Sequence, residues 1–129
     1  MNKNSPHILV VDDEDSIRLN LEAFFEDENC RVTCASNAED ALEKTASELF
    51  DAGIIDIRLP DMDGNCLIHK IRSLQPEMKF IIHTGSADYT LPESLSRAGI
   101  CPRQVFIKPL SDMRILMQVI RDILEPAAE

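Results

Sequence analysis

The chain has 129 residues, of which 44% are hydrophobic and 28% are charged, with a formal net charge of −10. This is the length of one domain, with enough apolar residues to form a core without metal or disulfide cross-links. The acidic balance argues against direct contact with nucleic acid, because phosphate binding needs a basic face, and no apolar stretch is long enough to span a membrane.

The cysteines form neither a CxxC pair nor a Cys/His cluster with the spacing of a zinc site. They are Cys30, Cys34, Cys66 and Cys101. We interpret them as reduced thiols, because disulfides are rare in the reducing cytoplasm. The chain shows no signal peptide at its start, so we predict a cytoplasmic protein.

Short apolar runs rich in β-branched residues alternate with segments of helical periodicity along the chain. The predicted strands cover residues 7–11, 31–35, 52–56, 80–84 and 104–108. The apolar residues that recur at helical spacing are Ile17, Leu21, Phe24 and Phe25, then Ala38, Ala41, Leu42 and Thr45, then Leu67, Ile68, Ile71 and Leu74, and finally Leu116, Val119, Ile120 and Ile123. A shorter helix with a thin apolar face is predicted over 91–98, and Asn37, Thr90 and Ser111 are predicted helix caps.

Strands that alternate with helices are typical of βαβ units, whose parallel sheet is covered on both faces. The predicted fold is therefore α/β, a doubly wound five-stranded parallel sheet with five helices in a three-layer sandwich. Right-handed crossovers restrict the strand order to a few arrangements. In such sheets ligands bind beyond the carboxyl ends of the strands, so the chemistry is expected there.

Polar side chains stand at four of the five predicted strand ends. They are Asp12 and Asp13 after the first strand, Asp56 at the end of the third, Thr84 at the end of the fourth and Lys108 at the end of the fifth. Any one of them alone has an ordinary explanation, such as a turn, a helix cap or a surface lysine. Together they place three carboxylates, a hydroxyl and an ammonium at one edge of the sheet.

Carboxylates held close together repel one another and favour a bound cation. Three carboxylates and one ammonium leave two uncompensated negative charges, which a single divalent ion balances. Oxygen ligands without His or Cys point to Mg²⁺, for which Mn²⁺ substitutes, rather than to zinc. A metal, a lysine and a hydroxyl around a lone carboxylate are also the groups that phosphoryl transfer to that carboxylate needs.

Four motifs resemble the receiver domain of two-component response regulators. They are ILVVDDE at 8–14, DIRLPDMDG at 56–64, HTGS at 83–86 and IKP at 107–109. The resemblance covers nearly the whole chain in the usual order. It implies a CheY-like, flavodoxin-like fold with strand order 2-1-3-4-5. It also implies a phosphorylation-controlled signalling switch rather than a conventional enzyme, with self-phosphorylation from phosphohistidine or acetyl phosphate and later loss of the phosphate.

Carried over residue by residue, the resemblance implies a role for each strand-end group. Asp56 matches the phosphoacceptor, Thr84 the hydroxyl that bonds a phosphoryl oxygen, and Lys108 the lysine that pairs with the phosphoryl group. The implied Mg²⁺ ligands are Asp12, Asp13, Asp56 and the backbone carbonyl of Arg58. Pro60 and Gly64 match loop-shaping residues, and the bond between Lys108 and Pro109 is expected to be cis.

The same resemblance implies the partners and the boundaries. We expect a sensor histidine kinase or histidine phosphotransfer protein as phosphoryl donor, and a downstream protein target or an output domain outside this chain. A phosphorylation-dependent dimer is left open, as is whether the chain is complete or part of a longer regulator. We predict a polar tail at 1–6, the receiver domain at 7–124, and a tail or linker from 125 to 129.

One position departs from the family pattern. Many receivers carry an aromatic residue three positions before the lysine, and here that position is Val105. Phe106 is adjacent, but strand alternation predicts that it points to the opposite face of the sheet. The relay of the signal away from the acceptor is therefore not predicted from the resemblance.

Alternative functions remain open at this point. A receiver-shaped binding module without phosphorylation would usually lack part of the acidic set, and a phosphohydrolase with Asp12 as nucleophile would need an aspartate where Glu14 stands. A calcium loop at DMDG would need other residues at Leu59 and Lys70. His83 is interpreted as a packed structural histidine that points away from the side of Thr84.

Overall fold

The computed structural model describes residues 5–125. The strands are β1 (His7–Val11), β2 (Arg31–Ala35), β3 (Ala52–Ile55), β4 (Lys79–Thr84) and β5 (Val105–Ile107). The helices are α1 (Asp15–Asp27), α2 (Ala38–Ser47), α3 (Gly64–Leu74), α4 (Glu93–Arg97), α5 (Met113–Leu124) and a 3₁₀ turn at Pro102–Gln104. All strand pairs are parallel and the order is β2-β1-β3-β4-β5, which confirms the predicted fold class.

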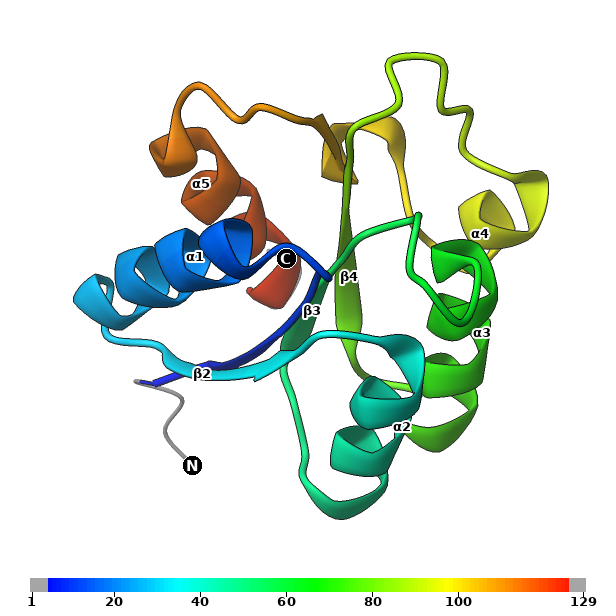
Figure 1. Ribbon diagram of the computed structural model, residues 1–129, viewed down its shortest axis with the longest axis horizontal. Helices are drawn as coiled ribbons and strands as arrows, with labels where there is room; N and C mark the ends of the chain where they lie inside the picture. The colour runs from blue at the N-terminus through cyan, green and yellow to red at the C-terminus, as the bar shows by residue number, and fades with distance from the viewer. Residues whose placement is uncertain (1–4, 126–129) are drawn as a thin grey trace.

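The sheet lies between two helical layers, as Figure 1 shows, with α1 and α5 on one side and α2, α3 and α4 on the other. The inner strands β1 and β3 are buried along their whole length, so both of their faces need helical cover. Alternate residues of β1 serve the two layers: Leu9 packs with the α2–α3 side, whereas Ile8 packs with the α1–α5 side.

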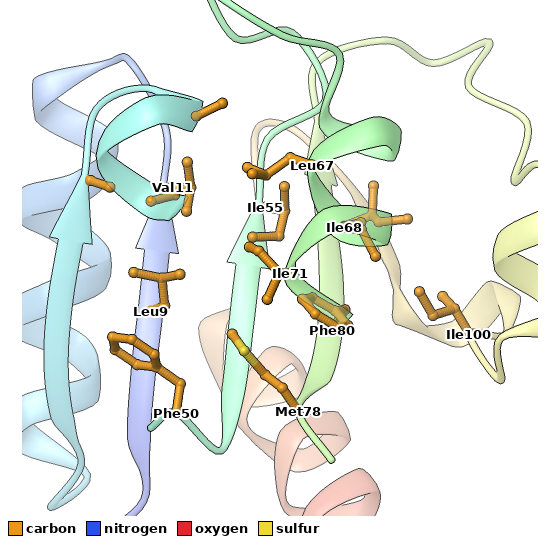
Figure 2. Close-up of a cluster of buried hydrophobic side chains, with 14 of the residues drawn as sticks. Leu9, Val11, Phe50, Ile55, Leu67, Ile68, Ile71, Met78, Phe80 and Ile100 are labelled. Carbon is orange, nitrogen blue, oxygen red and sulfur yellow. The ribbon is translucent and has the colours of Figure 1, made fainter. Parts of the chain in front are cut away.

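The core on the α2–α3 side is the cluster drawn in Figure 2. Leu9 and Val11 of β1, Ile55 of β3 and Phe80 of β4 point toward Ile71 and its neighbours on α3. We call this set the α3-side core. Because it is packed from consecutive alternate positions of three strands, it fixes the register that brings the strand ends together.

Two strands are shorter than predicted. β3 ends at Ile55 rather than Asp56. The Asp56 amide still donates to the Val11 carbonyl at 3.0 Å, but its side chain accepts from the Arg58 amide in the loop that follows. β5 covers Val105–Ile107 rather than 104–108, so Lys108 directly follows the strand. Gln104 belongs to the 3₁₀ turn instead, where its buried amide donates to the Phe80 carbonyl at 2.8 Å.

The predicted caps are right at one helix and wrong at two. Asn37 caps α2 by accepting from the Asp40 amide at 2.8 Å. Asp112, not Ser111, caps α5. The helix predicted over 91–98 covers only Glu93–Arg97, and Pro92 rather than Thr90 precedes it. A residue before proline avoids helical backbone, which excludes a start at residue 91.

The predicted tails lie largely outside the described residues, namely at positions 1–4 and 126–129. The boundaries at 7 and 124 therefore stay a prediction, although β1 begins at His7 and α5 ends at Leu124. Within residues 5–125, none of the helices combines the length and the apolar character that a membrane crossing requires.

Gly64 opens α3 directly against the backbone that carries Asp56. A Cβ at Gly64 would lie 2.7 Å from the Ile57 Cα and closer still to the Asp56 carbonyl oxygen. We therefore expect Gly64→Ala to lower the free energy of unfolding by about 3 kcal/mol, since backbone cannot move aside as a flexible side chain does.

Gly85 provides the matched control, because a Cβ there meets nothing within 4 Å. Gly85→Ala should change the free energy of unfolding by less than about 0.5 kcal/mol. Urea denaturation of both variants checks the pair. Equal stability of the two variants would contradict the close approach at Gly64.

Candidate functional site

The polar residues predicted at the strand ends converge at one edge of the sheet. Carboxylate oxygens of Asp12, Asp13 and Asp56 all lie within 4.8 Å of one another. Asp12 and Asp56 are buried, with exposed fractions of 2% and 4%, whereas Asp13 is exposed. Since β1 and β3 are hydrogen-bonded neighbours, their ends place these side chains together.

Lys108 reaches this cluster from the end of β5. Its Nζ lies 2.8 Å from Asp12 Oδ2, 3.2 Å from Glu14 Oε1 and 3.4 Å from Asp56 Oδ2. Its backbone amide donates to the Thr84 carbonyl at 2.7 Å. The Lys108–Pro109 bond is cis, as the resemblance implied. One ammonium is thus shared among three carboxylates.

The charged groups of the cluster shift one another's pKa values. Burial, followed by the charge of Asp12, raises the pKa of Asp56, and the neighbouring Lys108 opposes this rise. Burial would lower the pKa of Lys108, but the hydrogen bond and charge of Asp12 and the charge of Asp56 outweigh it and raise that pKa. The ammonium therefore remains charged, while the Asp56 carboxylate is only partly compensated.

Glu14 is a member of the site that the sequence reasoning considered only as a mismatch to another enzyme class. Its carboxylate pairs with Lys108, and its amide donates to Asp12 Oδ1 at 2.9 Å. Arg18 on α1 donates to the Asp12 carbonyl at 2.7 Å. The available signal was the position of Glu14 directly after two aspartates, which carries it to the same strand end.

A hollow of about 350 Å³ opens at this edge of the sheet. Its lining residues are Asp13, Glu14, Asp56, Arg58, Gly85 and Lys108. The Arg58 amide donates to Asp56 Oδ1 at 3.3 Å, which holds one carboxylate oxygen and leaves the other toward Lys108. The volume is sufficient for a phosphoryl group with a hydrated cation.

Thr84 does not line this hollow. Its side chain is fully buried, with an exposed fraction of 0%, and its Oγ1 accepts a hydrogen bond from the Ser86 amide at 3.2 Å. The hydroxyl therefore lies at the end of β4 beside the loop that contains Gly85, and it is already hydrogen-bonded to the Ser86 amide of that loop. A role for it at Asp56 requires the hydroxyl to turn.

Val105, which stands where many receivers have an aromatic residue, and its neighbour Phe106 point to opposite faces of the sheet, as predicted. Val105 packs against the α3-side core, whereas Phe106 packs with the residues of α1 and α5. Phe106 is therefore on the wrong face to replace the missing aromatic residue at position 105.

The aspartates of DMDG serve as helix caps. Asp61 accepts hydrogen bonds from the amides of Ala38 and Glu39 at the start of α2, at 2.9 and 3.0 Å, and these bonds lower its pKa. Asp63 caps α3 through the Asn65 amide. Both carboxylates are thus directed at backbone amides, which fits the prediction that this segment is not a calcium loop.

His83 is buried on the α1–α5 side of the sheet, opposite to Thr84, as predicted. Neither ring nitrogen has a hydrogen-bond partner within the described part of the chain. Burial, together with the charge of Lys108, lowers the pKa of His83 to about 4. The imidazole is therefore neutral at physiological pH and resists protonation in the folded state.

The lowered pKa of His83 makes the folded protein less stable in acid. From pH 6.5, the ordinary value, down to about 4, the unfolded chain binds a proton at His83 that the folded protein excludes. Acid therefore favours unfolding across this window. We expect His83→Leu to be more stable than the parent protein, by a margin that grows about 2 kcal/mol between pH 7.5 and pH 5. Urea denaturation of both proteins at the two pH values measures it, and a constant margin would contradict the assignment.

Comparison with known proteins identifies the family. Residues 8–121 match the model of the response regulator receiver domain. The regulatory protein AtoC of Escherichia coli is 32% identical over 113 residues, covering 86% of this chain and 24% of AtoC. The transcriptional regulatory protein ZraR of Klebsiella oxytoca is 36% identical over 104 residues, covering 80% of this chain and 23% of ZraR. The chain thus spans about a quarter of the length of these relatives.

Solved structures agree with the family model. A CheY-like receiver domain protein from Methanospirillum hungatei is 35% identical with a TM-score of 0.80, covering 93% of this chain and 94% of that one. The response regulator TrrA of Thermotoga maritima, solved in complex with Mg²⁺ and BeF, is 28% identical with a TM-score of 0.77, covering 92% of this chain and 98% of that one. The chain belongs to the response regulator receiver domains, the phosphorylation-controlled switches of two-component signalling.

Proposed function

We propose that this domain accepts a phosphoryl group on Asp56 from a phosphohistidine of a partner kinase or histidine phosphotransfer protein, in a reaction that depends on Mg²⁺. The observation that carries the proposal is the environment of Asp56. Its carboxylate lines an open hollow, is held at one oxygen by the Arg58 amide and faces the Lys108 ammonium with the other.

The residues of the hollow suit a hard divalent cation. Asp13 and Asp56, together with the adjacent Asp12, offer carboxylate oxygens within 4.8 Å of one another, and neither His nor Cys belongs to this group. The raised pKa of Asp56, caused by burial and by Asp12, indicates a negative charge that Lys108 alone does not balance. We assign Asp12, Asp13, Asp56 and the Arg58 carbonyl as the groups that would hold Mg²⁺. When bound, the ion supplies positive charge to the oxygens of the transferring group.

The transfer step itself is a displacement at phosphorus. A carboxylate oxygen of Asp56 forms the new O–P bond while the P–N bond to the donor imidazole breaks, and the bonding electron pair remains on that nitrogen. Lys108 is positioned to pair with the phosphoryl oxygens, since its Nζ already lies 3.4 Å from Asp56 Oδ2. The Thr84 hydroxyl turns from the Ser86 amide to a phosphoryl oxygen.

The acyl phosphate is later lost to water, which attacks phosphorus and returns Asp56 to its carboxylate. We propose that Arg58 and Ser86, which lie two residues beyond Asp56 and Thr84, flank the path of that water. In this chain Arg58 is exposed at the rim of the hollow, and Ser86 is half-buried beside Thr84. We assign to them an influence on the lifetime of the phosphorylated state.

The wider role follows from the family and from the relatives. We propose that the domain works in the cytoplasm with a histidine kinase or phosphotransfer protein, and passes its state to a downstream protein or an output domain. ZraR, which resembles this chain over 23% of its own length, is a transcriptional regulatory protein. A phosphorylation-dependent dimer belongs to the same proposal.

Incubation with acetyl phosphate and Mg²⁺ tests the function without the unknown donor. Intact-protein mass spectrometry should detect one added phosphoryl group, and the addition should disappear when EDTA replaces Mg²⁺. Lack of any addition over a range of donor concentrations, with the protein folded, would overturn the proposal in favour of a binding module that signals without phosphorylation.

A further inference from the structure

Tyr89 lies in the connection between β4 and α4, which we define as residues 85–92. Its ring is half-buried and packs against the α3-side core. Its hydroxyl donates a hydrogen bond of 2.7 Å to Oδ1 of Asn65, the second residue of α3. This bond joins the 85–92 connection to the start of the helix that follows the Asp56 loop.

The same connection is tied to the acceptor site at its other end. The Ser86 amide donates to the Thr84 hydroxyl at 3.2 Å, and the Ser86 carbonyl accepts from the Tyr89 amide at 3.1 Å. Thr84, Ser86, Tyr89 and Asn65 therefore form one continuous series of hydrogen bonds from the end of β4 to α3. A change in the bond between Ser86 and Thr84 is therefore transmitted along this series to the bond between Tyr89 and Asn65.

Tyr89 also occupies the face of the sheet on which the usual aromatic residue of β5 is missing. Val105 and Tyr89 both pack against the α3-side core, and Phe106 packs on the other face. Burial, with the charge of Asp63, raises the pKa of Tyr89 to about 12, so its hydroxyl remains a donor across the physiological range. The side chain is thus a partly buried aromatic group with a single polar anchor.

We propose that Tyr89 is a positioning residue that favours the unphosphorylated state: its hydrogen bond to Asn65 holds the 85–92 connection in the form in which the Ser86 amide donates to the Thr84 hydroxyl. This proposal rests on the proposed function, because the bond between Tyr89 and Asn65 is broken when the Thr84 hydroxyl turns to a phosphoryl group on Asp56. The state of Asp56 is then reported through Tyr89 to α3 and α4 rather than through β5.

Such a bond opposes occupancy of the acceptor site, and by linkage its removal favours occupancy. Tyr89→Phe keeps the ring and removes the hydroxyl. We expect the phosphoryl mimic BeF₃⁻, with Mg²⁺, to bind this variant about fivefold more tightly than the parent, the factor that one hydrogen bond of about 1 kcal/mol supplies. A merely structural tyrosine would affect stability and leave the affinity for BeF₃⁻ unchanged.

Titration of beryllium into protein with excess fluoride and Mg²⁺, followed by ¹⁹F NMR, measures the affinity. Asn65→Ala removes the other partner and should give the same gain, and the double variant should gain no more than either single variant. Thr90→Val removes a hydroxyl from the same connection, where it donates to the Asp88 carbonyl at 3.5 Å, and should bind as the parent does. Unchanged or weaker binding by Tyr89→Phe, or additive gains in the double variant, would overturn the proposal.

A second readout needs no substitution. The chain contains one tyrosine and no tryptophan, so tyrosine emission comes from Tyr89 alone. Saturation with BeF₃⁻ should change this emission in step with binding, and unchanged emission from protein that demonstrably holds BeF₃⁻ would overturn the role of Tyr89. Equal binding of BeF₃⁻ to Asp56→Asn and to the parent would instead overturn the proposed function and, with it, this proposal.

Discussion

Asp56→Asn is expected to abolish phosphate uptake from acetyl phosphate. The amide has nearly the same shape and can still accept the hydrogen bond from the Arg58 amide. It lacks the anionic oxygen that attacks phosphorus, so the loss is chemical rather than structural. Intact-protein mass spectrometry of the two proteins under identical conditions measures the effect, and equal uptake by the variant would contradict the assignment of Asp56.

The same substitution is expected to stabilise the fold. Burial and Asp12 raise the folded-state pKa of Asp56, so its ionised form costs free energy in the folded protein at neutral pH. In EDTA at pH 7, Asp56→Asn should therefore raise the free energy of unfolding. The margin should shrink as the pH falls below the raised folded-state pKa, because the parent protein then protonates Asp56 in its folded form.

Asp61→Asn is the matched control for this gain. Asp61 is a carboxylate of the same loop, but two backbone amides of α2 bond to it and lower its pKa. The same chemical change should therefore reduce the free energy of unfolding at Asp61 and increase it at Asp56. Urea denaturation gives both signs, and a loss of stability in Asp56→Asn would contradict the account of charge repulsion.

Lys108→Met is expected to lower both the stability of the fold and the uptake of phosphate. The variant removes the one ammonium that contacts Asp12, Glu14 and Asp56 together. In the absence of Mg²⁺ the free energy of unfolding should fall by about 3 kcal/mol, because two buried carboxylates lose their counter-charge. Phosphate uptake should fall about a hundredfold, since the phosphoryl oxygens lose a fixed positive charge.

Mg²⁺ distinguishes this effect from a simple packing defect. A divalent ion that occupies the same acidic cluster should restore more stability to Lys108→Met than it adds to the parent protein. Lys44→Met, which breaks an ion pair with Asp40 on α2, should cost less than about 1 kcal/mol and should not respond to Mg²⁺ in this way. Thermal denaturation with and without Mg²⁺ compares the three proteins, and an equal response in all of them would contradict a metal site beside Lys108.

The sequence predicted the layers of the fold because its apolar pattern was unambiguous. β1 and β3 are buried at every position, and alternate residues such as Ile8 and Leu9 pack on opposite sides. The strand order came from the resemblance, since periodicity carries no information on which strands are neighbours. The local pattern also predicted the Asn37 cap, because the Asn37 side chain accepts a hydrogen bond from the Asp40 amide only three residues away.

The features that the sequence missed depend on contacts between distant residues. Gln104 reads as a strand residue, but its side chain bonds to the Phe80 carbonyl. Asp61 caps α2 from a loop 23 residues away from Ala38. The short α4 follows Pro92, whose effect on the start of the helix was outweighed in the prediction by the apparent cap at Thr90. The contacts of Gln104 and Asp61 are made with distant partners that periodicity does not reveal, whereas the start of α4 is set locally by Pro92.

The sequence predicted the main residues of the candidate site, but not the contacts that surround them. The strand-end rule alone brought together the three aspartates and Lys108, which the structure places in one cluster. Glu14 and the amide of Arg58 were not predicted to contact Lys108 and Asp56, because these contacts depend on how the chain turns after the strand. The bond between Tyr89 and Asn65 joins the 85–92 connection to the first turn of α3, 24 residues away in the sequence, and had no sequence signal.

Chemical location of the phosphoryl group tests the central claim most directly. An aspartyl phosphate is an acyl phosphate, which borohydride reduces to homoserine, whereas an unmodified carboxylate is not reduced. After reaction with acetyl phosphate and Mg²⁺, peptide mass spectrometry should find homoserine at position 56 and at no other aspartate. Homoserine at Asp12 or Asp13, or a phosphate that survives borohydride on another side chain, would contradict the assignment of Asp56 as the acceptor.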